Sequence, residues 1–149
     1  MTKRTTQIHA SAVSVNGQGC LVTGESGAGK STLCFEMIAL GADLIADDRV
    51  DLMTAGGELH LSCPELLRGR IEARGIGLIQ VPHVPHAIPC SLIVDMDDAA
   101  ERLPTPQHRD LLGISCPVIF GLRRPGLASI LSVLLGQGAL LDPERGIDP

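Results

Sequence analysis

The chain has 149 residues, a length that suits one domain with its own hydrophobic core. Its formal net charge of −5 and its low aromatic content argue against a nucleic-acid-binding protein. No stretch is long and apolar enough to cross a membrane, and the first residues lack the apolar segment of a signal peptide. The five cysteines are scattered without a C-x-x-C pair, which indicates reduced thiols in a cytoplasmic protein.

Two strands are predicted first, over residues 8–15 and 20–23, and the segment Asn16-Gly17-Gln18-Gly19 between them is typical of a hairpin turn. If Asn16 faces Gly19, the same register places His9 opposite Ser26. The first strand of the hairpin would then bring a histidine beside whatever follows the second strand.

The segment GESGAGKS, Gly24–Ser31, follows the second strand and fits the phosphate-loop pattern G-x-x-x-x-G-K-[ST]. Its glycines let the backbone curl so that successive N–H groups point at phosphate oxygens. Lys30 can reach the β- and γ-phosphates, and the Ser31 hydroxyl can bind Mg²⁺. The predicted nucleotide-binding residues are Gly24, Glu25, Ser26, Gly27, Ala28, Gly29, Lys30, Ser31 and Thr32.

A helix is predicted over residues 30–40, since Leu33, Met37 and Leu40 share one face. A short apolar strand, residues 43–46, follows and runs into Asp47-Asp48. Strands joined by such a helical crossover are parallel, so their carboxyl ends lie at one edge of the sheet. Asp47 and Asp48 are therefore expected beside the phosphate loop.

The rest of the chain predicts more strands and one more long helix. Strands are expected at 50–53 and 58–61 (a hairpin), 78–81, 91–94 and 114–120, with helices at 64–70 and 127–135, a loop at 72–77, a polar linker at 97–113 and a loose tail from Gly136. These elements predict a single α/β domain over residues 1–149, ordered from about residue 5 to about residue 135. Its central sheet, mixed or parallel, would be flanked by helices.

His9 and three later motifs occur in the order, and near the spacing, of one family. The motifs are GESGAGKS, LIADDRVDL (Leu44–Leu52) and IEARGIGLIQV (Ile71–Val81). Together they resemble the catalytic domain of bacterial HPr kinase/phosphorylase, and the resemblance implies its P-loop fold, which is related to that of phosphoenolpyruvate carboxykinase. Typical members carry an additional N-terminal domain, so the sequence resembles the short form of the family.

The resemblance implies a bifunctional enzyme. It would transfer phosphate from ATP, or from pyrophosphate, to a serine of the phosphocarrier protein HPr. It would also remove that phosphate by phosphorolysis with inorganic phosphate. The family is often hexameric, which leaves a trimer or a hexamer open for this chain.

The resemblance also implies roles for single residues. The family's catalytic aspartate falls on Asp48, a base for the serine hydroxyl, and its active-site histidine falls on His9. The expected catalytic residues are Asp48, His9, Lys30 and Arg74, and the expected Mg²⁺ ligands are Ser31, Glu72 and Asp47. The family's later basic segment is matched only loosely, by residues 121–126.

Two other functions remain open from the residues alone. In another P-loop ATPase or small-molecule kinase, Leu92-Ile93-Val94-Asp95 would be the Walker B strand, and Asp95 would hold Mg²⁺ through water. A non-catalytic regulator would bind nucleotide without turnover. Asp95→Asn would abolish activity in the small-molecule kinase, whereas Asp48→Asn would abolish it in the protein kinase.

Overall fold

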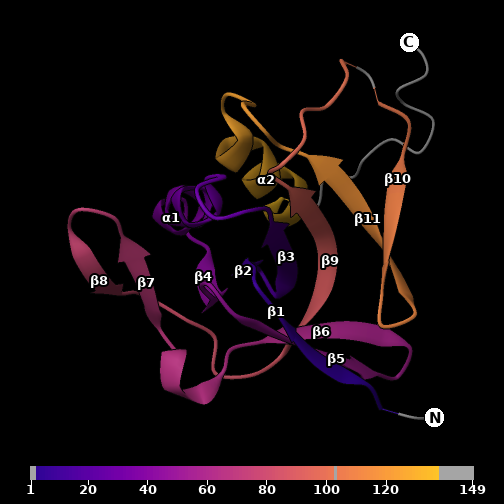
Figure 1. Cartoon of the computed structure of the whole chain (residues 1–149), viewed down its shortest axis with the longest axis horizontal. Helices are drawn as coiled ribbons and strands as arrows, with labels where there is room; N and C mark the ends of the chain where they lie inside the picture. Colours follow the sequence, from indigo (N-terminus) through magenta and orange to yellow (C-terminus); the bar gives the residue numbers. More distant parts are fainter. Residues whose placement is uncertain (1–2, 103, 138–149) are drawn as a thin grey trace.

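The computed structural model describes residues 3–102 and 104–137 (Figure 1). Its elements are β1 (Thr5–Ile8), β2 (Ser11–Val15), β3 (Gln18–Thr23), α1 (Lys30–Ala39), β4 (Asp43–Ala46), β5 (Val50–Ala55), β6 (Glu58–Ser62), the 3₁₀ turn η1 (Glu65–Leu67), β7 (Arg70–Ala73), β8 (Gly77–Gln80), β9 (Ile88–Asp95), β10 (Gln107–Leu111), β11 (Ile114–Phe120) and α2 (Leu127–Gly136). The tail expected from Gly136 onward lies outside the described residues, apart from Gly136 and Gln137. Neither α1 nor α2 has the length and apolar character that a membrane span requires.

A mixed, curled sheet of nine strands forms the body of the molecule. Its main path runs β1-β5-β6-β9-β3-β2-β4, while β11 joins β9 in parallel and β10 pairs with β11. The first residues of β9 pair with β6 and its last residues pair with β11, so the sheet divides into two branches along this strand. The β7–β8 hairpin is a separate sheet that projects from the body (Figure 1). The α/β class and the mixed sheet are as predicted.

The two helices cover one face of the central strands. Side chains of α1 and α2 pack there against Val13, Val22 and Val94. On the other face, Leu21 and Ile93 pack among residues of β5, β6 and β11, so the branches of the curled sheet close this side. Strands buried on both faces need apolar side chains in both directions. This explains why β2, β3 and β9 carry nearly continuous apolar runs.

The hairpin turn between β2 and β3 lies one residue earlier in the chain than expected. Val15 pairs with Gln18, and both central residues, Asn16 and Gly17, have positive φ (52° and 81°), as in a two-residue type I′ turn. The predicted register was therefore wrong by two residues. Extending the observed register places His9 opposite Gly24 rather than opposite Ser26. Because side chains alternate with period two, this shift leaves each residue on the same face of the sheet.

The crossover prediction is confirmed. Strands β3 and β4 each pair antiparallel with β2, which lies between them, so β3 and β4 are parallel to each other. Their carboxyl ends therefore meet the amino end of β2 at one edge of the sheet. The chain also breaks between β1 and β2, where His9 and Ala10 cross from the β5 branch into the central strands. This edge gathers the phosphate loop, Asp47-Asp48 and His9.

The helix expected at 64–70 is absent. Only the 3₁₀ turn η1 forms, and the chain then extends into β7. Arg68 is already extended, with a ψ of 134°, and Gly69 adopts a φ of 76°, outside the helical region. A Cβ at Gly69 would lie 2.7 Å from the ring of His83, so this position requires glycine.

The linker expected at 97–113 contains strand β10. It pairs with β11, from Gln107 opposite Val118 to Leu111 opposite Ile114. Its composition is polar because most of its side chains are exposed or only partly buried, and it lies at the edge of the sheet.

Candidate active site

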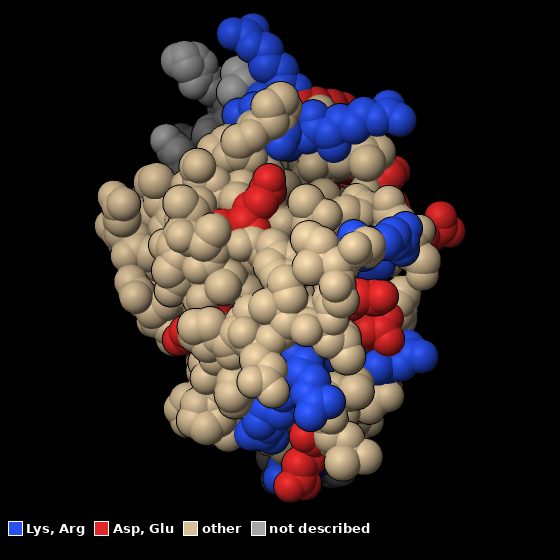
Figure 2. All heavy atoms as spheres, turned by 90° about the vertical axis from the view of Figure 1, so that its left-hand side faces the viewer, with Lys and Arg blue, Asp and Glu red and all other residues tan. Residues whose placement is uncertain are grey.

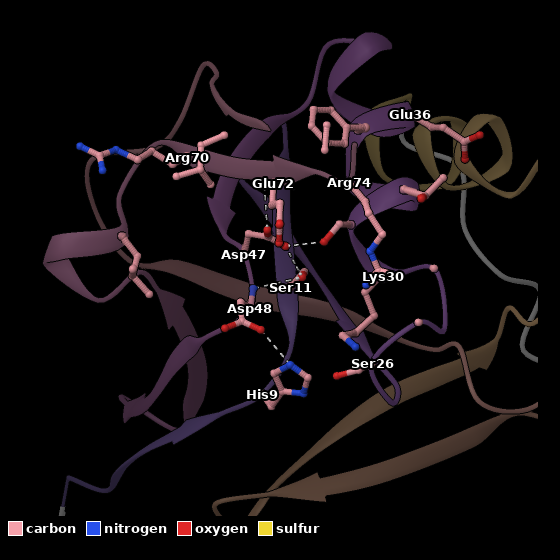
Figure 3. Close-up of a pocket in the computed structure, with 18 of the residues that line it drawn as sticks. His9, Ser11, Ser26, Lys30, Glu36, Asp47, Asp48, Arg70, Glu72 and Arg74 are labelled. Carbon is pink, nitrogen blue, oxygen red and sulfur yellow. Dashed lines mark hydrogen bonds and ion pairs between the residues drawn. The ribbon is translucent and has the colours of Figure 1, made fainter. Parts of the chain in front are cut away.

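An open cavity of about 710 Å³ lies at the edge of the sheet where these segments meet (Figure 3). Its lining residues are His9, Ser11, Ser26, Gly27, Gly29, Lys30, Ser31, Thr32, Phe35, Glu36, Asp47, Asp48, Leu66, Leu67, Arg70, Glu72, Ala73, Arg74 and Leu78. This set includes every residue expected to be catalytic or to bind Mg²⁺. Of the expected nucleotide-binding residues, Gly24, Glu25 and Ala28 belong to the same loop but do not line the cavity.

The phosphate loop has the curled backbone that its motif requires. At Gly24, with a φ of 146°, a Cβ would lie 3.1 Å from the Cβ of Ala28 and 3.2 Å from the Cβ of Met96. Any larger residue would push the loop away from β9. Gly27, in contrast, faces open space. The loop is thus packed tightly at its base and is accessible where a phosphate would bind.

Lys30 is held across this loop. Its Nζ donates hydrogen bonds to the carbonyl oxygens of Gly24 (2.7 Å) and Glu25 (2.9 Å), and the residue is buried. Lys30 and Ser31 are also the first residues of α1, whose N-cap is Gly29. The amino end of a helix carries partial positive charge and favours anions. The loop, the lysine and the helix end together fit the phosphates of a nucleotide.

Asp47 is fixed by hydrogen bonds from three segments (Figure 3). Its Oδ1 accepts from the hydroxyls of Ser11 and Ser31, each at 2.8 Å, and its Oδ2 accepts from the backbone N–H of Glu72 at 3.3 Å. Sequence reasoning missed Ser11, which is fully buried at the start of β2. The available signal was a polar residue in an apolar run, two positions after His9 and therefore near it in a strand.

Ser31 offers a hydroxyl oxygen, and Asp47 and Glu72 offer carboxylate oxygens, which are the kind of ligand that Mg²⁺ prefers. The described residues contain no group of three or more His, Cys, Asp or Glu side chains able to hold a metal ion. Magnesium uses one or two carboxylates and completes its shell with water and phosphate oxygens. A site of this composition fits that preference better than the preference of a transition metal for nitrogen or sulfur ligands.

Asp48 has an unusual backbone conformation. Its φ is 71°, and the N–H of Arg49 donates to the carbonyl of Asp47 at 2.8 Å, which closes a three-residue turn around it. Such a conformation costs about 1–3 kcal/mol and is found most often at functional sites. The turn directs the Asp48 carboxylate toward His9, whose Nε2 lies 2.8 Å from Oδ1. Because an ionised carboxylate can only accept, the imidazole N–H is the donor.

The β7–β8 hairpin forms one wall of the cavity. Glu72 lies on β7, not in the loop that the sequence predicted, and Arg74 lies in the exposed turn where the N–H of Ile76 donates to the carbonyl of Ala73 at 2.9 Å. Arg70 also lines the cavity, although its guanidinium points away from Asp47 and Asp48 (Figure 3).

Asp95 does not reach this cavity. It is buried at the end of β9, opposite Thr23, where its Oδ2 accepts from Arg109 at 2.6 Å and its Oδ1 accepts from the N–H of Asp97 at 2.8 Å. The guanidinium of Arg109, a cation, already occupies one oxygen of Asp95 and would compete with Mg²⁺ or its bound water there. The geometry therefore does not favour a Walker B role for Asp95. Arg123 and Arg124 are likewise not among the described residues that line the cavity.

Comparison with known proteins agrees with this geometry. Residues 1–87 match the family model described as HPr Serine kinase C-terminal domain. HPr kinase/phosphorylase from Bordetella pertussis is 40% identical over 123 residues, which cover 74% of this chain and 40% of that protein. HPr kinase/phosphorylase from Clostridium tetani is 47% identical over 77 residues, or 52% of this chain and 25% of that protein. The chain thus spans less than half the length of these relatives.

The fold has a solved counterpart. The structure of the Hpr(Ser) kinase/phosphatase from Coxiella burnetii superposes with a TM-score of 0.76 at 28% sequence identity, and covers 87% of this chain and 93% of that one. The family match covers the strands and loops that carry the phosphate loop, the Asp47-Asp48 turn and the β7–β8 hairpin. The chain belongs to the HPr serine kinase C-terminal domain family.

Proposed function

We propose that this chain is a protein-serine kinase/phosphorylase that acts on an HPr-type phosphocarrier protein. The observation that carries the proposal is the position of the His9–Asp48 pair, which lines the same cavity as Lys30 and Ser31 of the phosphate loop. A base and a phosphate-binding loop in one cavity suit the transfer of a phosphoryl group to a hydroxyl. Membership of the family, and the names of its relatives, support the choice of HPr.

Asp48 is the proposed base. In the forward direction its carboxylate accepts the proton that the serine hydroxyl loses as the serine oxygen bonds to phosphorus. In the reverse direction the protonated carboxyl returns that proton to the serine oxygen, and inorganic phosphate takes up the phosphoryl group to give pyrophosphate. His9 fixes Oδ1 of Asp48, so the carboxylate is oriented before the protein substrate binds.

The loop residues are proposed to bind ATP, or pyrophosphate as donor, through its phosphates, with Lys30 as their charged partner. Ser31, Asp47 and Glu72 would hold Mg²⁺. Bound Mg²⁺ would offset the negative charge of the phosphate oxygens. Arg74, at the exposed turn of the β7–β8 hairpin, would add positive charge at the same cavity.

The rim of the cavity favours a protein substrate over a small molecule. Leu66 on η1 and Leu78 on β8 line the cavity and are 90% and 69% exposed, and Ile76, in the turn of the β7–β8 hairpin, is 82% exposed. Figure 2 shows a broad area without charged side chains on this side of the molecule. Exposed apolar groups of this size at a binding cavity are typical of a protein–protein contact.

Two further properties belong to the same proposal. Ile130 and Val133 are exposed on α2 and suit contact between subunits of a homo-oligomer, a trimer or a hexamer. All five cysteines are free thiols, which suits the cytoplasm.

The test is phosphate transfer in both directions. The protein is incubated with labelled ATP, Mg²⁺ and an HPr-type carrier, and the modified residue is mapped by mass spectrometry. The phosphorylated carrier is then incubated with the protein and inorganic phosphate, and pyrophosphate is measured. The proposal predicts phosphoserine in the first reaction and pyrophosphate in the second. A protein that binds ATP but labels no serine under any condition would contradict it.

A further inference from the structure

A chain of polar contacts links the edge strand β10 to the first residues of the phosphate loop. Arg109 on β10 donates from Nη2 to Oδ2 of Asp95 at 2.6 Å. The other oxygen of Asp95 accepts the N–H of Asp97 at 2.8 Å, and Oδ1 of Asp97 accepts the N–H of Glu25 at 2.9 Å. The contacts thus connect Arg109, Asp95 and Asp97 to Glu25 in the phosphate loop. None of these four residues lines the cavity.

This chain of contacts is anchored in the sheet. Asp95 is buried and pairs with Thr23 between β9 and β3, and the next residue, Met96, donates its N–H to the carbonyl of Thr23 at 2.8 Å. Arg109 also approaches Thr23, with its Nη1 at 3.4 Å from the hydroxyl oxygen. The position of the Asp97 backbone is therefore set by the same two strands from which the loop begins.

The backbone of Glu25 is held at both of its polar groups. Its N–H binds the carboxylate of Asp97, and its carbonyl accepts from Nζ of Lys30 at 2.9 Å and from the N–H of Ala28 at 3.0 Å. Asp97 also packs close to Gly24, since a Cβ there would lie 3.4 Å from its Oδ1. A hydrogen bond to an ionised acceptor is stronger than one between neutral groups. Asp97 is thus the acidic counterpart of Lys30 in fixing the start of the loop.

We infer that Asp97 is a positioning residue for nucleotide binding. It fixes the first peptide of the phosphate loop so that the later N–H groups are oriented before the phosphates arrive, and Asp95 and Arg109 hold it in place. A loop that is already ordered loses less entropy on binding. The inference rests on the proposed use of this loop for nucleotide phosphates, but it does not depend on HPr as the acceptor.

The test compares three variants of the full chain. Asp97→Ala removes the acceptor, Asp97→Asn keeps an acceptor oxygen, and Asp98→Ala is the matched control, an exposed acidic neighbour whose backbone carbonyl binds Leu122. The affinity for ATP with Mg²⁺ is measured by titration without any carrier protein, and thermal unfolding checks that each variant is folded. Asp97→Ala is expected to weaken ATP binding roughly tenfold, the effect of losing one charge-assisted hydrogen bond. The ATP affinity of Asp97→Asn should stay within about threefold of the wild-type affinity, and the ATP affinity of Asp98→Ala should equal that of the wild type.

Turnover separates positioning from catalysis. Asp97→Ala should raise the KM for ATP while the kcat at saturating ATP changes less than about threefold, because Asp97 does not touch the reacting atoms. The inference would be overturned if Asp97→Ala bound ATP as tightly as the wild type, or if Asp98→Ala lost as much ATP affinity as Asp97→Ala. It would also be overturned if Asp97→Asn bound ATP no better than Asp97→Ala. A wild-type protein that binds ATP but transfers nothing to the carrier would contradict the proposed function alone.

Discussion

The imidazole of His9 and the carboxylate of Asp48 meet at 2.8 Å, although the two residues are 39 positions apart in the sequence. His9 lies where the chain passes from β1 to β2, and Asp48 follows β4, which is the direct neighbour of β2. The antiparallel pairing of β2 with β4 brings these two positions to the same edge of the sheet. The pair therefore follows from the topology of the central strands.

Replacing His9 tests its role in orienting Asp48. His9→Ala should lower kcat by roughly 10- to 100-fold with little change in ATP affinity, because an unfixed carboxylate is a poorly placed base. His9→Gln keeps an N–H donor at similar reach and should retain more activity. The measurement is steady-state transfer to the carrier together with ATP titration. Equal losses in the two variants would contradict the orienting role.

Ser11 should matter for Mg²⁺ through Asp47. Ser11→Ala removes one of the donors to Oδ1 of Asp47, a charge-assisted bond whose loss is expected to raise the half-saturating Mg²⁺ concentration roughly tenfold. Ser14→Ala is the control, since Ser14 is also buried on β2. The measurement is transfer rate against Mg²⁺ concentration at saturating ATP. An equal shift in both variants would show that the effect belongs to the strand and not to Asp47.

Local patterns predicted the parts of the site that are close in sequence. The phosphate loop, helix α1 and the position of Asp47-Asp48 follow from a motif, a periodicity and one crossover rule, each confined to a few residues. The hairpin register failed because Asn16-Gly17 can occupy either the centre or the first half of a turn, and only pairing across the strands distinguishes the two.

The contacts of Ser11 and Asp95 could not be predicted in this way. Both depend on which strands become neighbours, and local sequence patterns do not predict the order of strands in a sheet. The resemblance to the family supplied Glu72 and Arg74, and together with the hairpin register it supplied His9; composition and periodicity alone do not single out these residues. Strand β10 has a polar composition that is typical of a linker, so neither the strand nor its Arg109–Asp95 pair was predicted.

Asp95 is expected to stabilise the fold rather than to hold a metal. Asp95→Asn leaves Arg109 without its charged partner and should lower the free energy of unfolding by about 1–2 kcal/mol, less than for a fully buried pair because the Arg109 side chain is 36% exposed. The folded variant should still transfer phosphate at low temperature. Denaturant unfolding and activity are measured on the same preparation. A stable but fully inactive Asp95→Asn protein would instead support the Walker B assignment.

The apolar rim should affect the protein substrate alone. Leu78→Ser and Leu66→Ser should each raise the KM for the carrier several-fold, because each removes apolar area from the contact, while ATP affinity stays unchanged. Leu40→Ser is the control, an exposed leucine at the end of α1 that does not line the cavity. The same KM in rim and control variants would place the docking surface elsewhere.

Stability should fall at alkaline pH because of Cys20. Burial raises the pKa of this thiol from 9.0 to about 12. Its neutral form stabilises the fold fully below about pH 9, and this contribution is lost as the pH rises toward 12. Between these values the unfolded chain has released a proton that the folded chain retains, so the free energy of unfolding falls by about 1.4 kcal/mol per pH unit.

Cys20→Ala should remove this dependence. Urea unfolding at pH 8 and pH 10.5 should show a decline about 2 kcal/mol smaller in the variant than in the wild type. The variant is expected to be less stable at both pH values because a buried atom is lost, so the comparison rests on the difference between the two pH values. An equal decline in both proteins would assign the alkaline effect to other groups.

The most direct test of the proposed chemistry is phosphate transfer by Asp48→Asn. Asparagine tolerates the positive φ of this position, so the turn should be kept while the base is lost. With labelled ATP, Mg²⁺ and an HPr-type carrier, the wild type should label a serine, and Asp48→Asn should bind ATP with unchanged affinity but label that serine at least about 100-fold more slowly. Serine labelling by Asp48→Asn at the wild-type rate would contradict the account.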